Sequence, residues 1–139
     1  MKSNAQASLE LILLMSVFFS VLLLFIPLIS KTLFLGIFAL DASKAKAFSD
    51  SIEVSVRELN SMSEESKIAL TANPSLKWKI KSDQQQTTIT VLLEKYNKEK
   101  TFTSKTFNAI PFPELLIEEK TLFFLTKTDK GILIEIQKA

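Results

Sequence analysis

The chain has 139 residues, which suits one small globular unit, or a smaller one carried on a membrane segment. With 17 Lys and Arg against 15 Asp and Glu, its formal charge of +2 is too balanced for a chain built to coat phosphate backbones, so no nucleic-acid partner is expected. The lack of Cys and His excludes disulfides, the usual zinc sites, thiol nucleophiles and imidazole bases.

An apolar segment fills residues 9–40, and the charged side chains are almost confined to the residues that follow it. Its stretch 11–30 has about the twenty residues that a helix needs to span a hydrocarbon core of roughly 30 Å. A secretory signal has a shorter apolar core, of roughly 7 to 15 residues, followed by a small-residue cleavage site. We therefore expect this segment to stay in the mature protein as a transmembrane helix.

Two residues distinguish this segment from an ordinary membrane anchor. Glu10 stands at the start of the apolar run, where an ionised carboxylate is costly unless it has a partner. Pro27 lies inside the run and has no N–H to donate, so a kink or a local loosening of the helix is predicted there.

A short motif precedes and overlaps the start of the apolar run. Gln6, Ser8, Glu10 and Leu14 form the pattern Q-x-S-x-E-x-x-x-L. This pattern resembles the class III signal peptides of archaeal type IV pilin-like proteins. In that family a membrane-bound prepilin-type leader peptidase cuts directly before the glutamine, and the hydrophobic helix is kept. The resemblance implies a leader of residues 1–5 and a scissile bond between Ala5 and Gln6.

The resemblance also implies a partner for Glu10. Cleavage creates an ammonium group at Gln6, four residues before Glu10 and hence on the same helix face. In pilin-like filaments the acidic residue is thought to neutralise the N-terminal amine of its own or a neighbouring subunit as the helix leaves the bilayer. Paired charges are tolerable in an apolar bundle, whereas either charge alone is costly.

The helix is predicted to continue past the apolar run as an amphipathic half. After residue 40, apolar side chains recur every three to four positions with charged residues between them, at Ala42, Ala45, Phe48, Ile52, Val56, Leu59 and Met62. Asn73-Pro74 ends any helix. We predict one helix over 6–66, with an apolar half at about 9–40 and an amphipathic half at about 41–66.

Residues 72–139 are predicted to form a β-rich head. Alternating or β-branched residues indicate strands over 76–81, 87–93, 101–107, 121–128 and 132–137, the last two joined by a turn at Gly131. The two prolines of 108–114 predict a loop, in which Phe112 is either pinned in the core or exposed to a neighbouring subunit. The fold class is α+β: a long N-terminal hydrophobic helix whose amphipathic half packs on a small antiparallel sheet of about four to five strands, as in pilins.

The resemblance implies a structural subunit, a major or minor pilin of an archaeal type IV pilus-like surface filament. Its partners would be membrane lipid in the precursor, the leader peptidase, and identical or related pilin subunits in the mature extracellular filament. The alternative is a membrane-anchored extracytoplasmic binding module that does not polymerise. Lys31, Lys44 and Lys46 follow the span while Lys2 precedes it, a distribution that favours a cytoplasmic body and conflicts with the implied orientation. No catalytic residues, metal site or cofactor are predicted, because no acidic pair or cluster has the required spacing.

Overall fold

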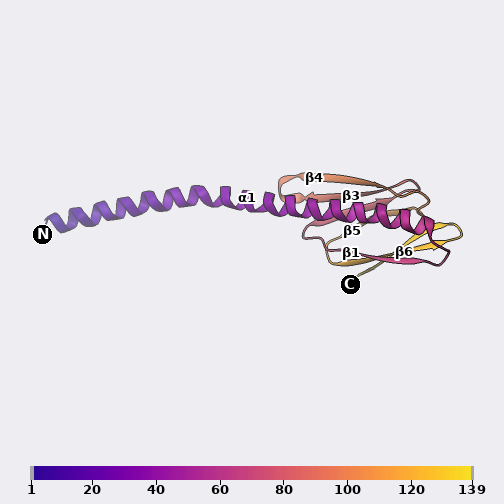
Figure 1. Ribbon diagram of the computed structural model, residues 1–139. Helices are drawn as coiled ribbons and strands as arrows, with labels where there is room; N and C mark the ends of the chain where they lie inside the picture. Colours follow the sequence, from indigo (N-terminus) through magenta and orange to yellow (C-terminus); the bar gives the residue numbers. More distant parts are fainter. Residues whose placement is uncertain (1, 139) are drawn as a thin grey trace. The chain divides into compact units, whose positions relative to one another are not determined.

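The computed structural model describes residues 2–138, without the side chains of 2–5; Met1 and Ala139 lie outside the described residues. The chain divides into two compact units, residues 1–36 and residues 37–139. Helix α1 (Lys2–Ser61) contributes to both units (Figure 1). The second unit, residues 37–139, contains the described strands and is called the head from here on. The elements after α1 are β1 (Lys67–Ala72), β2 (Lys77–Ser82), β3 (Gln86–Leu93), the short 3-10 helix η1 (Glu94–Tyr96), β4 (Lys98–Lys105), β5 (Phe112–Ile117), β6 (Thr121–Thr128) and β7 (Gly131–Lys138).

The strands form two antiparallel sheets. One sheet has the order β1-β6-β7 and the other has the order β4-β3-β2-β5. The predicted α+β class is confirmed: one long N-terminal helix packs against antiparallel sheets, an arrangement consistent with a pilin-like fold. Residues 2–138 contain more strands than the sequence indicated, with seven strands in two sheets instead of about four to five in one.

The end of α1 and the strand after it differ from the predicted boundaries. The helix ends at Ser61, where Lys127 of β6 donates hydrogen bonds to the carbonyl oxygens of Asn60, at 3.0 Å, and of Met62. A lysine that caps the last carbonyls stabilises a helix C-terminus. Glu65 then takes a positive φ of 70° in a turn, and β1 follows at once as the partner of β6. The sheet region therefore begins at Lys67, before the predicted head boundary at residue 72.

The predicted loop over 108–114 contains the first residues of a strand. β5 includes Pro113, one of the two prolines from which the loop was predicted. β5 is the last strand of its sheet, so the missing N–H of Pro113 need not face a neighbouring strand. A register shift between Ile80 and Ser82, opposite this part of β5, accommodates the irregular segment. Phe112 is half-buried and packs against the core, the first of its two predicted placements.

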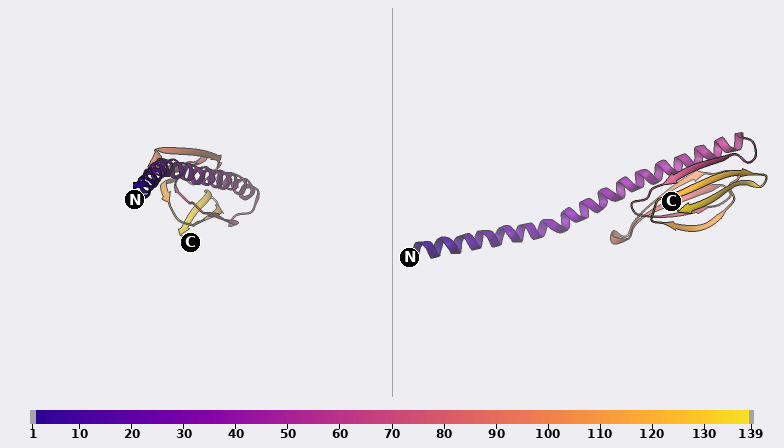
Figure 2. Two further views of the ribbon diagram at one scale, coloured as in Figure 1. Left: turned by 90° about the vertical axis from the view of Figure 1, so that its left-hand side faces the viewer. Right: turned by 90° about the horizontal axis from the view of Figure 1, so that it is seen from below.

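The core of the head lies between α1 and the two sheets. Phe48 of α1 is central, with its ring centroid 5.1 Å from that of Phe123 and 6.1 Å from that of Trp78. Figure 2 shows the later part of α1 lying along the strands. Each fully buried large side chain stabilises the fold by about 1.5–3 kcal/mol. The buried cluster consists of Ala45, Phe48, Ile52, Val56, Leu59, Ala72, Trp78, Ile80, Ile89, Val91, Ile117, Phe123, Leu125 and Ile132.

A buried carboxylate fixes α1 to the segment that leads into β2. Asp41 is fully buried, and its oxygens accept hydrogen bonds from the backbone N–H groups of Ser75, at 2.7 Å, and Leu76, at 3.0 Å. The indole Nε1–H of Trp78 donates a third, at 2.6 Å. A buried carboxylate is tolerated when several donors replace its water. Asp41 therefore sets how α1 enters the head, a role that the sequence analysis did not predict.

Candidate membrane and assembly segment

The first unit consists of helix whose apolar side chains are exposed. Between Gln6 and Ser61 the described chain has one helix that is long and apolar enough to cross a membrane, and its most apolar window is not buried. Such a helix indicates membrane insertion or a signal sequence. The exposed fractions include 75% for Leu24, 67% for Leu23 and 68% for Leu14. These side chains are far more exposed than the core residues of the head, and they need an apolar environment.

The spacing of charged residues matches the thickness of a bilayer. Lys31 follows Glu10 by 21 positions, and no charged residue lies between them. At 1.5 Å per residue the two are separated by about 32 Å of helix, close to the roughly 30 Å of a hydrocarbon core. Both residues are exposed, so their side chains can reach the headgroup layers from the two ends of the span.

The motif residues occupy the first described turns of α1. Gln6, Glu10 and Leu14 follow one another at intervals of four, so they share a helix face, whereas Ser8 points to the other side. All four are exposed. The predicted processing position involves Ala5, whose side chain lies outside the described residues, and Gln6. Cleavage at that bond would place the new amine on the face that carries Glu10.

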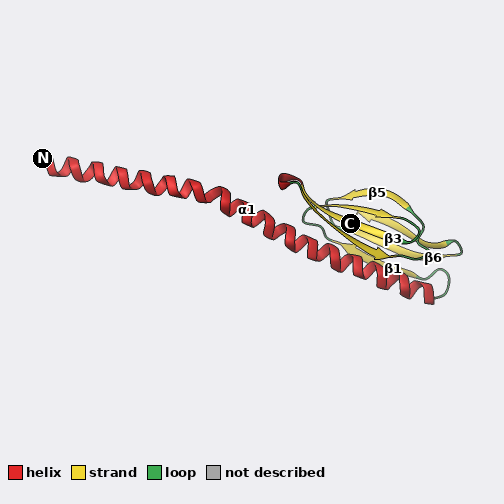
Figure 3. Cartoon of the chain, turned by 90° about the horizontal axis from the view of Figure 1, so that it is seen from above, coloured by secondary structure: helices red, strands yellow, loops and turns green. Residues whose placement is uncertain are grey.

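Pro27 lies inside α1, and the helix is assigned as continuous through it (Figure 3). Because Pro27 has no N–H, the carbonyl of Leu23 loses its usual helical donor. Two nearby hydroxyls bond to the helix itself: Ser20 Oγ donates to the carbonyl of Ser16 at 2.8 Å, and Thr32 Oγ1 to that of Leu28 at 3.0 Å. Hydroxyls satisfied in this way can be placed in lipid. The kink at Pro27 stays a prediction.

The outward face of β2 carries Lys77, Lys79 and Lys81, and the structure pairs the first two with carboxylates. Lys77 Nζ lies 3.1 Å from Glu118 and 3.2 Å from Glu94, while Lys79 lies 3.5 Å from Glu114. Hydrogen bonds to Glu118 and then to Glu94 raise the pKa of Lys77 above its usual 10.5. Exposed pairs of this kind contribute little to stability, about 0–1 kcal/mol each, so this face is polar and close to neutral.

In the β2–β3 turn, Asp83 Oδ1 accepts backbone hydrogen bonds from Gln85, at 2.9 Å, and Gln86, at 2.8 Å. These two hydrogen bonds lower the pKa of Asp83 below its usual 3.8, and the bond from Gln85 has the larger effect. The carboxylate closes the turn between the two strands. Over residues 2–138 no group of three or more Asp and Glu is arranged to hold a metal ion.

No family model, no curated protein and no solved structure matches the chain. The helical segment 6–36 is apolar, and most of its large side chains are exposed.

Proposed function

We propose that this protein is a structural subunit, major or minor, of a type IV pilus-like surface filament. Its α1 helix is stored in the membrane, loses residues 1–5, and then packs with the α1 helices of identical or related subunits. The role is structural and uses no cofactor or catalytic residue. The proposal rests on the apolar surface of α1, where about twenty large apolar side chains from Leu9 to Leu40 are exposed.

The free energy of this surface restricts where the helix can be. At about 1.5–3 kcal/mol per large side chain, exposing all of them to water would cost on the order of tens of kcal/mol. Lipid or a bundle of similar helices removes this cost. A helix that is apolar on all sides suits both environments, unlike a helix with a single apolar stripe. This supports storage in a bilayer followed by transfer to a filament core.

The motif supports the proposal that α1 changes environment. A carboxylate at Glu10 is costly in a helix bundle unless it is paired. An amine at Gln6, one turn earlier on the same face, is the nearest group that cleavage would supply. The pair of charges would set the axial register between neighbouring helices, since a shifted helix would leave both charges unpaired.

The first experiment determines the N-terminus of the protein isolated from its host by mass spectrometry, together with its presence in filaments sheared from cells. We expect a chain that begins at Gln6 and a sheared fraction that contains it. A chain that begins at Met1 and stays entirely in the membrane would show a non-polymerising anchored module instead.

The second experiment tests the charge pair. The Glu10→Ala variant should be cleaved normally but should yield far fewer filaments. Glu53→Ala is a matched control, since Glu53 is a carboxylate on α1 that pairs with Arg57 at 3.1 Å on the head surface. Normal filament yield from Glu10→Ala would contradict the pairing role.

A further inference from the structure

The edge strands β5 and β7 of the two sheets face each other along a line that we call the seam. The sheets are bridged at one end of this seam and unpaired at the other. β5 and β7 are terminal strands of their sheets. Just before β5, a parallel bridge links Ala109 to Ile132 of β7, with backbone hydrogen bonds of 2.8 Å from Ile110 to Ile132 and from Ile132 to Asn108. The described strands show no pairing between β5 and β7 beyond this bridge. Each strand therefore keeps an unpaired edge along the open part of the seam.

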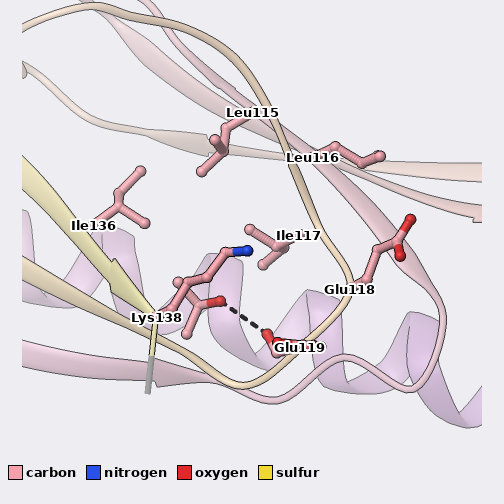
Figure 4. A pocket seen from close by; sticks show the side chains of 8 residues that line it. Leu115, Leu116, Ile117, Glu118, Glu119, Ile136 and Lys138 are labelled. Atoms are coloured by element: carbon pink, nitrogen blue, oxygen red, sulfur yellow. Dashed lines mark hydrogen bonds between the residues drawn. The ribbon is translucent and has the colours of Figure 1, made fainter.

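An apolar cleft of about 370 Å³ occupies this open part. Leu115 and Ile117 of β5 and Ile136 of β7 point toward the same space, as Figure 4 shows. The rim carries Glu118, Glu119 and Lys138, and the hydroxyl of Thr121 holds the Glu119 carbonyl at 2.8 Å. The volume is at the lower end of the range for binding pockets and suits one apolar side chain.

An exposed aromatic side chain lies at the bridged end. Phe107 follows β4 and is 59% exposed, the only Phe or Trp of the described head with most of its surface exposed. Its loop is held by hydrogen bonds from the Thr106 N–H to the Gln85 carbonyl, at 2.9 Å, and from the Ile132 N–H to the Asn108 carbonyl. Lys130 is the one charged residue that lines the same surface hollow. The ring is thus displayed on a fixed loop beside a positive charge.

The aromatic ring and the cleft lie at opposite ends of the seam. Asn108 is bonded to Ile132, and Ile136 and Lys138 lie four and six residues further along β7. At about 3.3 Å per strand residue, these positions are about 13 and 20 Å from the bridge. Phe107 therefore does not fill the cleft of its own head.

We propose that Phe107 of one copy inserts into the β5–β7 cleft of a second copy. The carboxylate of Glu119 at the rim is opposite in charge to Lys130 beside the ring, which favours this pairing. Glu118 is already paired with Lys77 at 3.1 Å, and Lys138 adds one positive charge to the rim. The contact joins unlike surfaces of the two copies, so it repeats head to tail, and it builds an open helical array when the rotation between copies does not close a ring. The inference rests on the proposed function and adds to it a contact between heads along the filament.

Cysteine cross-linking tests the contact directly, because the natural chain has no Cys. The full-length Phe107→Cys/Ile136→Cys variant is oxidised in assembled filaments and separated under denaturing, non-reducing conditions. Disulfides need Cα atoms within about 7 Å, and position 136 lies about 13 Å along β7 from the bridge that adjoins the Phe107 loop, so the two positions of one head cannot be bridged internally. We expect a ladder of covalent oligomers. Each single-cysteine variant is a control that can form at most a dimer.

Substitutions measure the strength of the same contact. Phe107→Ser should weaken assembly about tenfold or more, the value of one buried aromatic side chain. Met62→Ser is the matched control, since Met62 is also exposed on the head, at 44%, but does not line the hollow that contains Phe107. Lys130→Glu should reduce filament yield, and adding Glu119→Lys should restore it.

The outcomes separate the contact from the proposed function. Filaments that form normally in Phe107→Ser, and that give no ladder with the double-cysteine variant, overturn the contact while the filament role stands. Filaments that form normally in Phe107→Ser but fail in Ile136→Glu would show that the cleft takes another ligand, which also overturns it. If the natural chain forms no filaments, the filament role is overturned. The cross-link is then scored on the full chain concentrated in detergent micelles, where a ladder supports the contact and its absence overturns it.

Discussion

Helix α1 passes from a segment with exposed apolar side chains to a segment with buried ones. Leu24, in the first unit, is 75% exposed, whereas Ile52 and Leu59, in the head, are 2% and 0% exposed. The difference follows from the arrangement of apolar residues. In residues 9–30 they surround the helix, but in the head they form one stripe with charged residues opposite. A single element can therefore be made for two different solvents by its side-chain pattern alone.

The comparison also shows where each part obtains its stability. The head buries its stripe against its own sheets, through contacts such as those of Phe48 with Trp78 and Phe123. In residues 6–36 most large apolar side chains are exposed, and the ring contact of Phe18 with Phe19 lies within the helix itself. Their apolar surface has to be covered by lipid or by other chains.

The largest effect is expected from truncating one apolar side chain in each region of α1. Ile52→Ala should lower the free energy of unfolding of the head by about 2–5 kcal/mol, because it leaves a cavity in the core. Leu24→Ala should change it by less than about 0.5 kcal/mol. Both changes would be measured by denaturant unfolding of the full chain in detergent micelles, with Trp78 fluorescence as the signal. Equal effects would show that the two regions do not differ as described.

Removing the buried carboxylate should have the next largest effect. Asp41→Ala leaves the N–H groups of Ser75, Leu76 and Trp78 without their acceptor, so we expect a loss of about 3 kcal/mol in the same assay. Asp50→Ala is the control, because the ion pair of Asp50 with Lys46 is exposed and contributes less than about 1 kcal/mol. A loss as small as that of the control would mean that Asp41 does not fix α1 to the head.

A smaller loss is expected at the turn that closes the head. Gly131 has a φ of 131°, and a Cβ there would lie 2.4 Å from the carbonyl oxygen of Asn108. Gly131→Ala should therefore cost about 1–3 kcal/mol, through backbone strain and displacement of the bridged loop. The same substitution at Gly36, where a Cβ meets nothing within 4 Å, should be neutral or slightly stabilising. Thermal unfolding of the two variants compares them directly.

The smallest effect is a dependence of stability on acidity. The lowered pKa of Asp83 means that its contribution is present above its usual 3.8 and is lost as the pH falls through the folded-state value. The stability difference between the natural chain and Asp83→Ala should shrink from about pH 5 to about pH 2. Asp83→Asn keeps an acceptor but not the charge, so its stability should lack this component. An unchanged difference across that range would contradict the prediction.

Much of the fold could be predicted because its periodic patterns are long. The helix, the strands β2 and β3, and the hairpin β6–β7 were recognisable from alternation and spacing, as with Trp78 and Ile80 between lysines. β1 was missed because its strand signal is short and follows a segment that could continue the helix. β5 was missed because Pro113 is a reliable strand breaker in the interior of a sheet but not at its edge.

The candidate site was predictable to a different degree. The motif residues Gln6, Ser8, Glu10 and Leu14 are close in sequence, so their helical positions follow directly from spacing. The cleft was not predictable, because Leu115 and Ile136 are brought together only when two sheets meet. The exposed aromatic side chain of the head is Phe107, whereas the sequence offered Phe112 as the candidate for contact with a neighbouring subunit. The difference arises in the tertiary structure, where the loop between them is bridged to β7.

The sequence by itself determined that this protein has a long apolar helix and a β-rich body, because side-chain periodicity reflects the solvent that each face meets. Tertiary structure alone decided which polar groups are paired. Asp41 is satisfied by donors 34 to 37 residues away, and the buried hydroxyls of Ser82, Thr87 and Thr106 bond to one another at 3.0 and 3.1 Å. The local spacing of residues does not predict such partners, since contacts between distant segments arise only when the strands and the helix pack together.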